Sequence, residues 1–238
     1  MFVPRRSEGD RLKALFAGGW IAALAGFIVL AAFAEEQTRF AGDLWISQHA
    51  QRIHSPLFAG SIDLAEAIAS APYVVALIAG PMILLWYFNR RREALLMLAV
   101  PLGWSVNAVV KVLVDRPRPS ELLVNVTSHP SDASFPSGHV IVAALAFGLI
   151  FYVATVLIRH AWRRIAVQVF CVYGVVFTGI ARIYHGEHWA SDVYGSLLLA
   201  SLVLAVVIAA HRRTPGASTA APQPWTPRWS VEEPELRQ

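Results

Sequence analysis

Six long apolar stretches, each free of charged side chains, constrain this chain more than any other feature. The hydrocarbon core of a bilayer is about 30 Å thick, and a helix needs roughly 17 to 25 apolar residues to cross it. Helices are required because hydrocarbon offers no hydrogen-bond partner to an open backbone. The sequence therefore predicts an all-α fold, a bundle of six transmembrane helices. The six stretches are Ala14–Ala34, Ala67–Phe88, Ala94–Val110, Val140–Ile158, Ile165–Ala181 and Val193–Ala210.

Composition supports a membrane protein. Of the 238 residues, 56% are hydrophobic, which exceeds the apolar share of an ordinary soluble domain. Lys and Arg occur in short clusters between the apolar stretches and form no continuous basic stripe, so we expect no nucleic-acid partner. The expected partner is the lipid bilayer itself, and no oligomeric state follows from the sequence.

Positive charges fall on alternate connecting segments, which predicts the orientation of the spans. Short loops rich in Lys and Arg stay in the cytoplasm. The basic segments are residues 5–13, 90–92, 159–164 and 212–213, whereas the segment after the first stretch carries more acidic than basic residues. We therefore predict that both termini are cytoplasmic and that the protein lies in the inner (plasma) membrane of a bacterium.

The chain is expected to form one membrane domain, residues 1–211, followed by a disordered cytoplasmic tail, residues 212–238. The tail is rich in Pro, Ser and Thr and has too few apolar residues for a core. The first apolar stretch resembles a secretory signal peptide, but it is too long for one. Within residues 36–58 we predict a short interfacial helix that places Phe40, Ala41, Leu44 and Trp45 on one face.

Polar residues cluster at the outside ends of the predicted spans. Lys111 closes the third span, and the prolines on both sides of Arg118 stop that helix, so the two cations can converge. Pro136-Ser137-Gly138-His139 opens the fourth span. The free N–H groups and positive dipole of a helix N-terminus favour an anion such as phosphate. Taken separately, the cations could be interfacial anchors and the tetrapeptide a simple helix cap.

A third polar group lies between the fifth and sixth spans. His188 and Asp192 are one helical turn apart, so the carboxylate can fix the tautomer of the imidazole. This arrangement is typical of a nucleophile or a general base, and Arg182 could bind the same anion. A metal site built from His139, His185, His188 and Asp192 is the alternative. The surrounding cations argue against it, because they would repel a divalent ion and attract a phosphate.

Together these motifs resemble the type 2 phosphatidic acid phosphatase family, which is related to the vanadium haloperoxidases. The family pattern is Lys, six residues and Arg-Pro, then Pro-Ser-Gly-His, then Ser-Arg, five residues, His, three residues and Asp. The matching positions, all within residues 111–192, are Lys111, Arg118-Pro119, Pro136-Ser137-Gly138-His139, Arg182, His188 and Asp192. Ala181 departs from the pattern, since the family usually has Ser or Gly there.

The resemblance implies a role for each motif residue. His188 is expected to attack phosphorus and form a phosphohistidine, and Asp192 to orient it. His139 is expected to protonate the leaving oxygen and then to activate water. The expected phosphate ligands are Lys111, Arg118, Ser137, Gly138 and Arg182. Such a mechanism needs no metal and no cofactor, and the resemblance gives no role to His185 or Glu187.

The predicted function is hydrolysis of a lipid phosphate or diphosphate at the outer face of the membrane. Undecaprenyl diphosphate is the first candidate substrate, narrowly ahead of phosphatidic acid and other lipid phosphates. One alternative is a vanadate-dependent haloperoxidase, which the apolar helices disfavour because soluble helical bundles keep polar outer faces. The other is a non-catalytic protein that binds or transports phospholipids, although no catalytic position of the pattern is substituted.

Overall fold

The structure is a computed structural model that describes residues 8–213. Within that range every regular element is a helix, as predicted. In chain order these are α1 Glu8–Glu36, α2 Asp43–Ala50, α3 Pro56–Ala69, α4 Ala71–Tyr87, α5 Arg91–Leu95, the 3-10 turn η1 Leu96–Leu98, α6 Ala99–Val114, α7 Gly138–Leu157, α8 Ala161–Tyr184 and α9 Ala190–Arg213. Arg212 and Arg213, with which the predicted tail starts, belong to α9, and the rest of that predicted segment, residues 214–238, lies outside the described residues.

Five segments are each long and apolar enough to cross a bilayer: Ala14–Glu36, Arg91–Val114, Gly138–Leu157, Ala161–Tyr184 and Ala190–Arg213. Among the described residues, α3 and α4 pass the same test only as a bent pair, which makes six spans if the pair is counted as one span. The all-α membrane fold is therefore confirmed, with five continuous spans and a bent pair where the second span was predicted.

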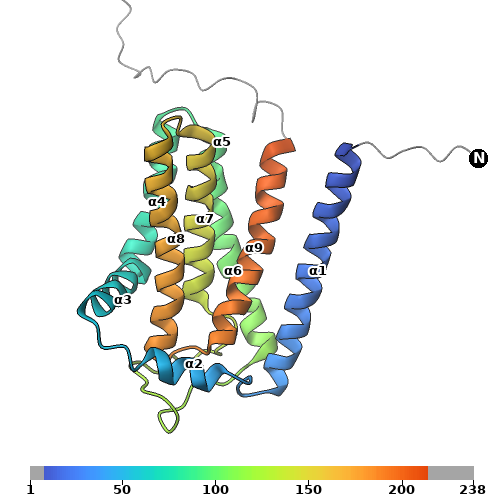
Figure 1. Cartoon of the computed structure of the whole chain (residues 1–238). Coiled ribbons are helices and arrows are strands. Elements are labelled where there is room, and N and C mark those ends of the chain that lie inside the picture. The colour runs from blue at the N-terminus through green and yellow to red at the C-terminus, as the bar shows by residue number, and fades with distance from the viewer. Residues whose placement is uncertain (1–7, 214–238) are drawn as a thin grey trace, which may run out of the picture.

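The second predicted span is broken rather than continuous. Helices α3 and α4 meet at Ser70 with a bend of 69°, so the stretch Ala67–Phe88 begins in one helix and ends in the other. Ser70 has an extended backbone. Pro72, which lies in the first turn of α4, favours the break, because a proline lacks the N–H that would continue α3 by bonding the carbonyl four residues earlier, and its ring clashes with that carbonyl. Figure 1 shows α3 leaning away from the bundle.

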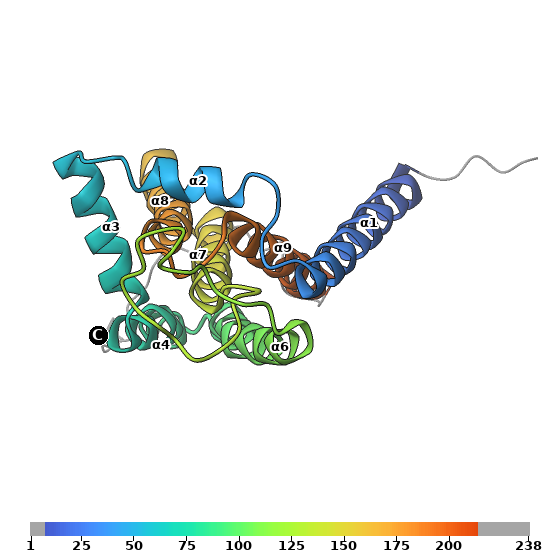
Figure 2. The ribbon, with the colours of Figure 1, turned by 90° about the horizontal axis from the view of Figure 1, so that it is seen from below.

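Helix α7 occupies the centre of the bundle. It contacts α4, α6, α8 and α9, and Figure 2 shows these four helices around it. Its buried residues Ile141, Leu145 and Leu149 belong to the main hydrophobic core. Helix α1 packs on the outside against α9 and α6. Apolar side chains of α1 such as Ile21 and Ile28 remain exposed, as expected for a surface that faces lipid.

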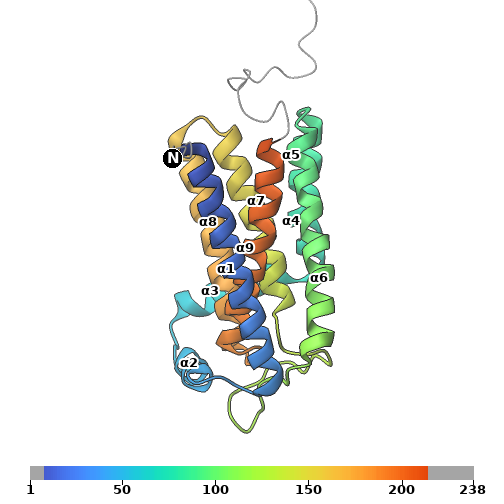
Figure 3. The same ribbon diagram turned by 90° about the vertical axis from the view of Figure 1, so that its right-hand side faces the viewer.

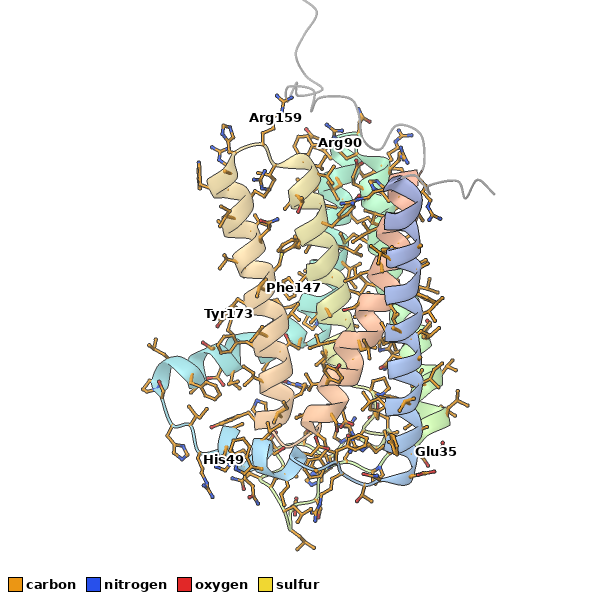
Figure 4. The ribbon with its side chains drawn as sticks, turned by 45° about the vertical axis from the view of Figure 1, so that its right-hand side comes forward. Glu35, His49, Arg90, Phe147, Arg159 and Tyr173 are labelled. Atoms are coloured by element: carbon orange, nitrogen blue, oxygen red, sulfur yellow. The ribbon has the colours of Figure 1, made fainter. Side chains whose placement is uncertain are left out.

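The two ends of the bundle differ in charge. The first residues of α1 and the last residues of α9 lie at the same end (Figure 1), and Arg90 and Arg159 are at that end too (Figure 4). Glu35 and His49 lie at the opposite end, where α2 runs across the ends of the long helices (Figures 3 and 4). The basic loops therefore share one end of the bundle, and their cytoplasmic location stays a prediction.

Helix α2 lies within the segment where an interfacial helix was predicted. The predicted face is wrong in part, because Phe40 and Ala41 precede the helix. Gly42, with φ of 96°, separates them from it, and a glycine adopts this left-handed geometry without strain. Trp45 is exposed, at 63%.

Candidate active site

A cavity of about 360 Å³ lies between α4, α6, α7 and α8 near the end that carries α2. Five of the predicted site residues line it: Lys111, Arg118, Gly138, His139 and His188. Apolar residues that include Leu77, Val142 and Phe147 continue the wall toward the middle of the bundle, and Figure 4 shows Phe147 about halfway along α7. The cavity thus joins a polar region near α2 to an apolar passage that runs toward the middle of the bundle.

His188 sits in the turn between α8 and α9. The turn is set by Gly186, which has φ of 64° and passes so close to the carbonyl of Asn125 that a Cβ atom would lie 2.2 Å from its oxygen. No other residue type fits this position without a shift of the loop. Nε2 of His188 lies 3.3 Å from Nη1 of Arg118, on the cavity side.

Asp192 stands behind His188, on the first turn of α9. Its Oδ2 lies 3.6 Å from Nδ1 of His188, which is longer than a hydrogen bond. Catalytic hydrogen bonds are often long in the ligand-free state and tighten when substrate binds. The same oxygen accepts the N–H of Trp189 at 2.8 Å, as an acidic residue at the third helical position does in a capping box. The helix cap therefore fixes the carboxylate beside the imidazole.

Burial lowers the pKa of His188, and the nearby cations Arg118 and Lys111 lower it further, while Asp192 acts in the opposite direction. The imidazole is therefore neutral at neutral pH, with a free lone pair for nucleophilic attack.

Asp132 holds the two cavity cations. Lys111 donates to Oδ2 of Asp132 at 2.5 Å, and Arg118 donates to Oδ1 at 2.6 Å. Burial alone would raise the pKa of Asp132, but the hydrogen bonds from Lys111 and Arg118 lower it to about 2. Sequence reasoning missed this residue, because an acidic residue in a polar loop carries no distinguishing signal.

Arg182 is turned toward acidic residues and does not line the cavity. Its Nη1 atom pairs with Glu187 at 2.6 Å, and Nη2 pairs with Glu66 of α3. Glu187 also accepts a hydrogen bond from Ser128 and lines the cavity beside His188. Burial would raise the pKa of Glu187, but Ser128 and Arg182 bring it below its ordinary value, so it remains ionised. Glu187 thus has a structural role that the sequence pattern does not assign.

The start of α7 places Ser137 and Gly138. Ser137 is the N-cap, and its backbone N–H donates to Ser196 at 2.7 Å. Its hydroxyl is buried and has no hydrogen-bond partner in the described structure. Gly138 borders the cavity, where a Cβ atom would lie 3.3 Å from Nδ2 of Asn107. Of these two predicted phosphate ligands, only Gly138 lines the cavity.

His185, a ligand in the metal alternative, is not brought to the same place. It is absent from the cavity wall that His139 and His188 share, and its Nε2 lies 3.9 Å from Glu66. Burial and the charge of Arg182 lower its pKa. The four residues of that alternative therefore do not surround one point.

Arg116 is a second residue that the sequence pattern did not reveal. It is fully buried and donates to Oδ1 of Asp192 at 2.5 Å and to Oδ2 of Asp43 at 3.1 Å. Asp43 belongs to α2 and also accepts the backbone N–H of Ser191 at 2.9 Å. The carboxylate behind His188 is thus tied to a helix at the surface of the bundle.

The geometry supports phosphoryl transfer. A neutral histidine faces the cavity with a carboxylate behind it, a second histidine shares the cavity, and two cations lie beside them. Nucleophile, orienting group, acid or base, and anion ligands are the parts that such a reaction needs.

Comparison with known proteins identifies relatives of this arrangement. The family model of the PAP2 superfamily matches residues 92–215. Phosphatidylglycerophosphatase B of Bacillus subtilis is 30% identical over 191 residues, which are 76% of this chain and 89% of the relative. Undecaprenyl-diphosphatase BcrC of the same organism is 32% identical over 103 residues, 42% of this chain and 48% of the relative.

A solved structure has the same fold. The crystal structure of a transmembrane PAP2-type phosphatidylglycerolphosphate phosphatase from Bacillus subtilis superimposes with a TM-score of 0.64 and 25% sequence identity. The match covers 81% of this chain and 96% of that one.

Proposed function

Because this chain belongs to the PAP2 superfamily and is a hydrolase of lipid phosphates, we propose that it acts through a phosphohistidine at the non-cytoplasmic face. The observation that carries the proposal is the position of His188. Its Nε2 lies beside Arg118 in a cavity whose far wall is apolar. A phosphate at Nε2 would be attached to a lipid whose first carbon atoms enter that passage.

In the first step Nε2 of His188 attacks phosphorus, and the bond from phosphorus to the leaving oxygen breaks. His139 gives its proton to that oxygen, so the lipid leaves as a neutral alcohol when the substrate is a phosphate monoester. The imidazole becomes positively charged as the new N–P bond forms, and Asp192 stabilises that charge across the 3.6 Å contact. In the second step His139 takes a proton from water, the water oxygen attacks phosphorus, and the N–P bond breaks, which releases inorganic phosphate and restores neutral His188.

The oxygens of the transferred phosphoryl group need cations in place before the reaction begins. Lys111 and Arg118 are suitably placed, but Asp132 binds both, so the phosphate must replace this carboxylate as their partner. Arg182 must likewise exchange Glu187 for phosphate if it is to act as a ligand. The buried hydroxyl of Ser137 and the N–H of Gly138 are the remaining proposed donors.

Among the candidate lipids, the lining of the cavity favours a monoester over a diphosphate. One and two turns before Lys111, α6 presents Asn107 and Trp104 to the cavity, and α8 presents Thr178. These residues are neutral, whereas the second phosphate of a diphosphate would need a cation there. We therefore place phosphatidylglycerophosphate, the substrate in the name of one relative, ahead of undecaprenyl diphosphate.

The test is phosphate release by the purified protein from phosphatidylglycerophosphate, phosphatidic acid and undecaprenyl diphosphate. We expect release from all three, with the highest kcat/KM for phosphatidylglycerophosphate and none for the His188→Ala variant. A wild-type protein that releases no phosphate from any lipid would refute the proposed function. A preference for the diphosphate would refute only the substrate order.

A further inference from the structure

Arg116 is a fully buried guanidinium that the proposed reaction does not use. It lies in the loop after α6, two residues before Arg118, and is absent from the cavity wall; its hydrogen bonds go to the groups behind His188. Besides the two carboxylates, it donates to the hydroxyl of Ser191 at 2.7 Å and to the carbonyl of Gln37 at 3.2 Å. A buried arginine is costly unless its charge is compensated, so its acidic partners are part of the same unit.

Asp192 accepts the hydrogen bond from Arg116 with the carboxylate oxygen that does not face His188. Oδ1 accepts from Arg116, whereas Oδ2 accepts from Ser134 at 2.5 Å and from Trp189 and faces the imidazole. One guanidinium so close to Asp192 would cancel most of the negative charge that stabilises a positive His188. The carboxylate could then orient the imidazole but would stabilise its charge only weakly.

Asp43 supplies the missing charge. Its side chain is 3% exposed, and it shares Arg116 with Asp192. The group Asp43, Arg116 and Asp192 therefore carries one net negative charge, which a positive His188 neutralises. Asp43 lies on α2, outside residues 92–215 that match the family model.

We propose that Asp43 and Arg116 are positioning residues that set the charge Asp192 presents to His188. Arg116 holds the carboxylate in place, and Asp43 offsets the guanidinium so that Asp192 remains an effective counter-ion for the phosphohistidine. This inference rests on the proposed function, since it assigns a role within the same catalytic step.

Other charged groups share the cavity with His188 and also act on its protonation, so the test must leave them unchanged. From α6 and the following loops these are Lys111, Arg118 and Asp132, and from α7 and the α8–α9 turn they are His139 and Glu187. None of them is altered in the variants below. Any shift common to all variants, including titration of the substrate phosphate, cancels in the comparison.

The experiment measures the rate of enzyme labelling by a ³²P aryl phosphate as a function of pH, in full-length detergent-solubilised protein. The acidic limb of this profile is the pH range in which the labelling rate rises as His188 loses its proton. Asp43→Asn removes a negative charge, which favours neutral His188, so the acidic limb should move to lower pH. Arg116→Gln removes a positive charge, so the limb should move to higher pH. Each shift should be about 0.5 to 1 pH unit. The maximum labelling rate should fall in both variants. Asp43→Asn reduces the negative charge that Asp192 presents to His188, and Arg116→Gln removes the hydrogen bond that holds Asp192 in place.

Three controls separate charge setting from simple support of the fold. Arg116→Lys keeps the charge and should leave the limb in place, and the double variant Asp43→Asn with Arg116→Gln should return it close to the wild-type position. Asp63→Asn removes an exposed charge from α3 and should shift nothing. Melting temperatures identify any variant that fails to fold. If Arg116→Gln does not fold, the two single variants Asp43→Asn and Arg116→Lys decide whether the charge near Asp192 sets the position of the acidic limb.

The inference would be overturned if the acidic limb lay at the same pH in the folded wild-type and Asp43→Asn proteins. It would also be overturned if Asp43→Asn and Arg116→Gln moved the limb in the same direction. Absence of labelling in the wild-type protein would instead refute the phosphohistidine step. The two failures are therefore distinguishable.

Discussion

Lys111 donates a hydrogen bond of 2.5 Å to Asp132, so a carboxylate within the chain occupies a cation that we propose as a ligand of the transferred phosphate. Arg118 binds the other oxygen of the same carboxylate. A carboxylate that two cations bind in this way resembles the anionic edge of a phosphate. Substrate must therefore compete with Asp132 for its ligands.

Replacing Asp132 by Asn should strengthen the binding of phosphate. Competition from an ion pair that is partly exposed to solvent is worth about 0.5 to 1 kcal/mol, so KM and the inhibition constant of phosphate should fall about two- to fivefold. Because the pKa of Asp132 is lowered to about 2, the carboxylate is fully ionised above about pH 4 and is lost only as the pH falls toward 2. The ratio of the wild-type and variant constants should therefore be the same at pH 5 and at pH 8.

Steady-state kinetics at those two pH values check this prediction. Glu121→Gln is the matched control, since Glu121 lies in the same loop, is 67% exposed and pairs only with His129 among the described ion pairs. It should leave both constants unchanged. A higher KM for Asp132→Asn would mean that this carboxylate organises the cations for substrate and does not compete with it.

A cysteine at position 125 tests which side of the membrane the cavity faces. Asn125 is exposed in the loop beside the active site, whereas Arg159 is exposed at the opposite end. In a Cys171→Ala background, which removes the one native cysteine, Asn125→Cys should react with an impermeant thiol reagent in intact cells. Arg159→Cys should react only after the membrane is broken. The reverse pattern would place the reaction on the cytoplasmic face.

Vanadate and a chelator test the nature of the anion site. A trigonal-bipyramidal vanadate resembles the phosphoryl group in the transition state, so it should inhibit more strongly than phosphate does. Activity should survive EDTA, because the proposed steps use only side chains. Complete loss on chelation, with recovery on addition of one divalent ion, would favour the metal alternative.

The spans could be predicted because membrane insertion depends on a property of single segments. The length of a charge-free apolar stretch shows whether it can cross the bilayer as a helix, whatever that helix packs against. The break at Ser70 is different, because Pro72 can be accommodated within a transmembrane helix if its neighbours satisfy the freed backbone groups. Helix α3 packs against α8, and a contact between segments this far apart in the chain cannot be read from one apolar stretch.

The site was predictable where a motif is local and short. His188 and Asp192 follow from helical spacing, and the structure places His139, Lys111 and Arg118 on one cavity with His188. Pairing between distant segments was not predictable, since any buried cation selects its partner by geometry. Arg182 thus faces Glu66 and Glu187, and Arg116 reaches Asp43 on α2.

The two cavity histidines should fail in different ways when replaced. His139→Ala should still form a phosphoenzyme from an aryl phosphate, whose leaving group needs little protonation, but should hydrolyse it about 10² to 10⁴ times more slowly for lack of a base. Asp192→Asn should form it more slowly, by up to about 10⁴-fold if it behaves like the aspartate of comparable triads. Single-turnover kinetics separate formation from hydrolysis. Equal loss of both steps in His139→Ala would assign this residue to binding.

The most direct test of the account is covalent labelling of His188. The full-length protein is mixed with a ³²P aryl phosphate, quenched in alkaline detergent and examined for bound label, with His185→Ala as the control because that neighbour does not line the cavity. We predict label that is stable in base and labile in acid, as a phosphoramidate is, in the wild-type and His185→Ala proteins and none in His188→Ala. Label at the wild-type level in His188→Ala would contradict the assignment of the nucleophile.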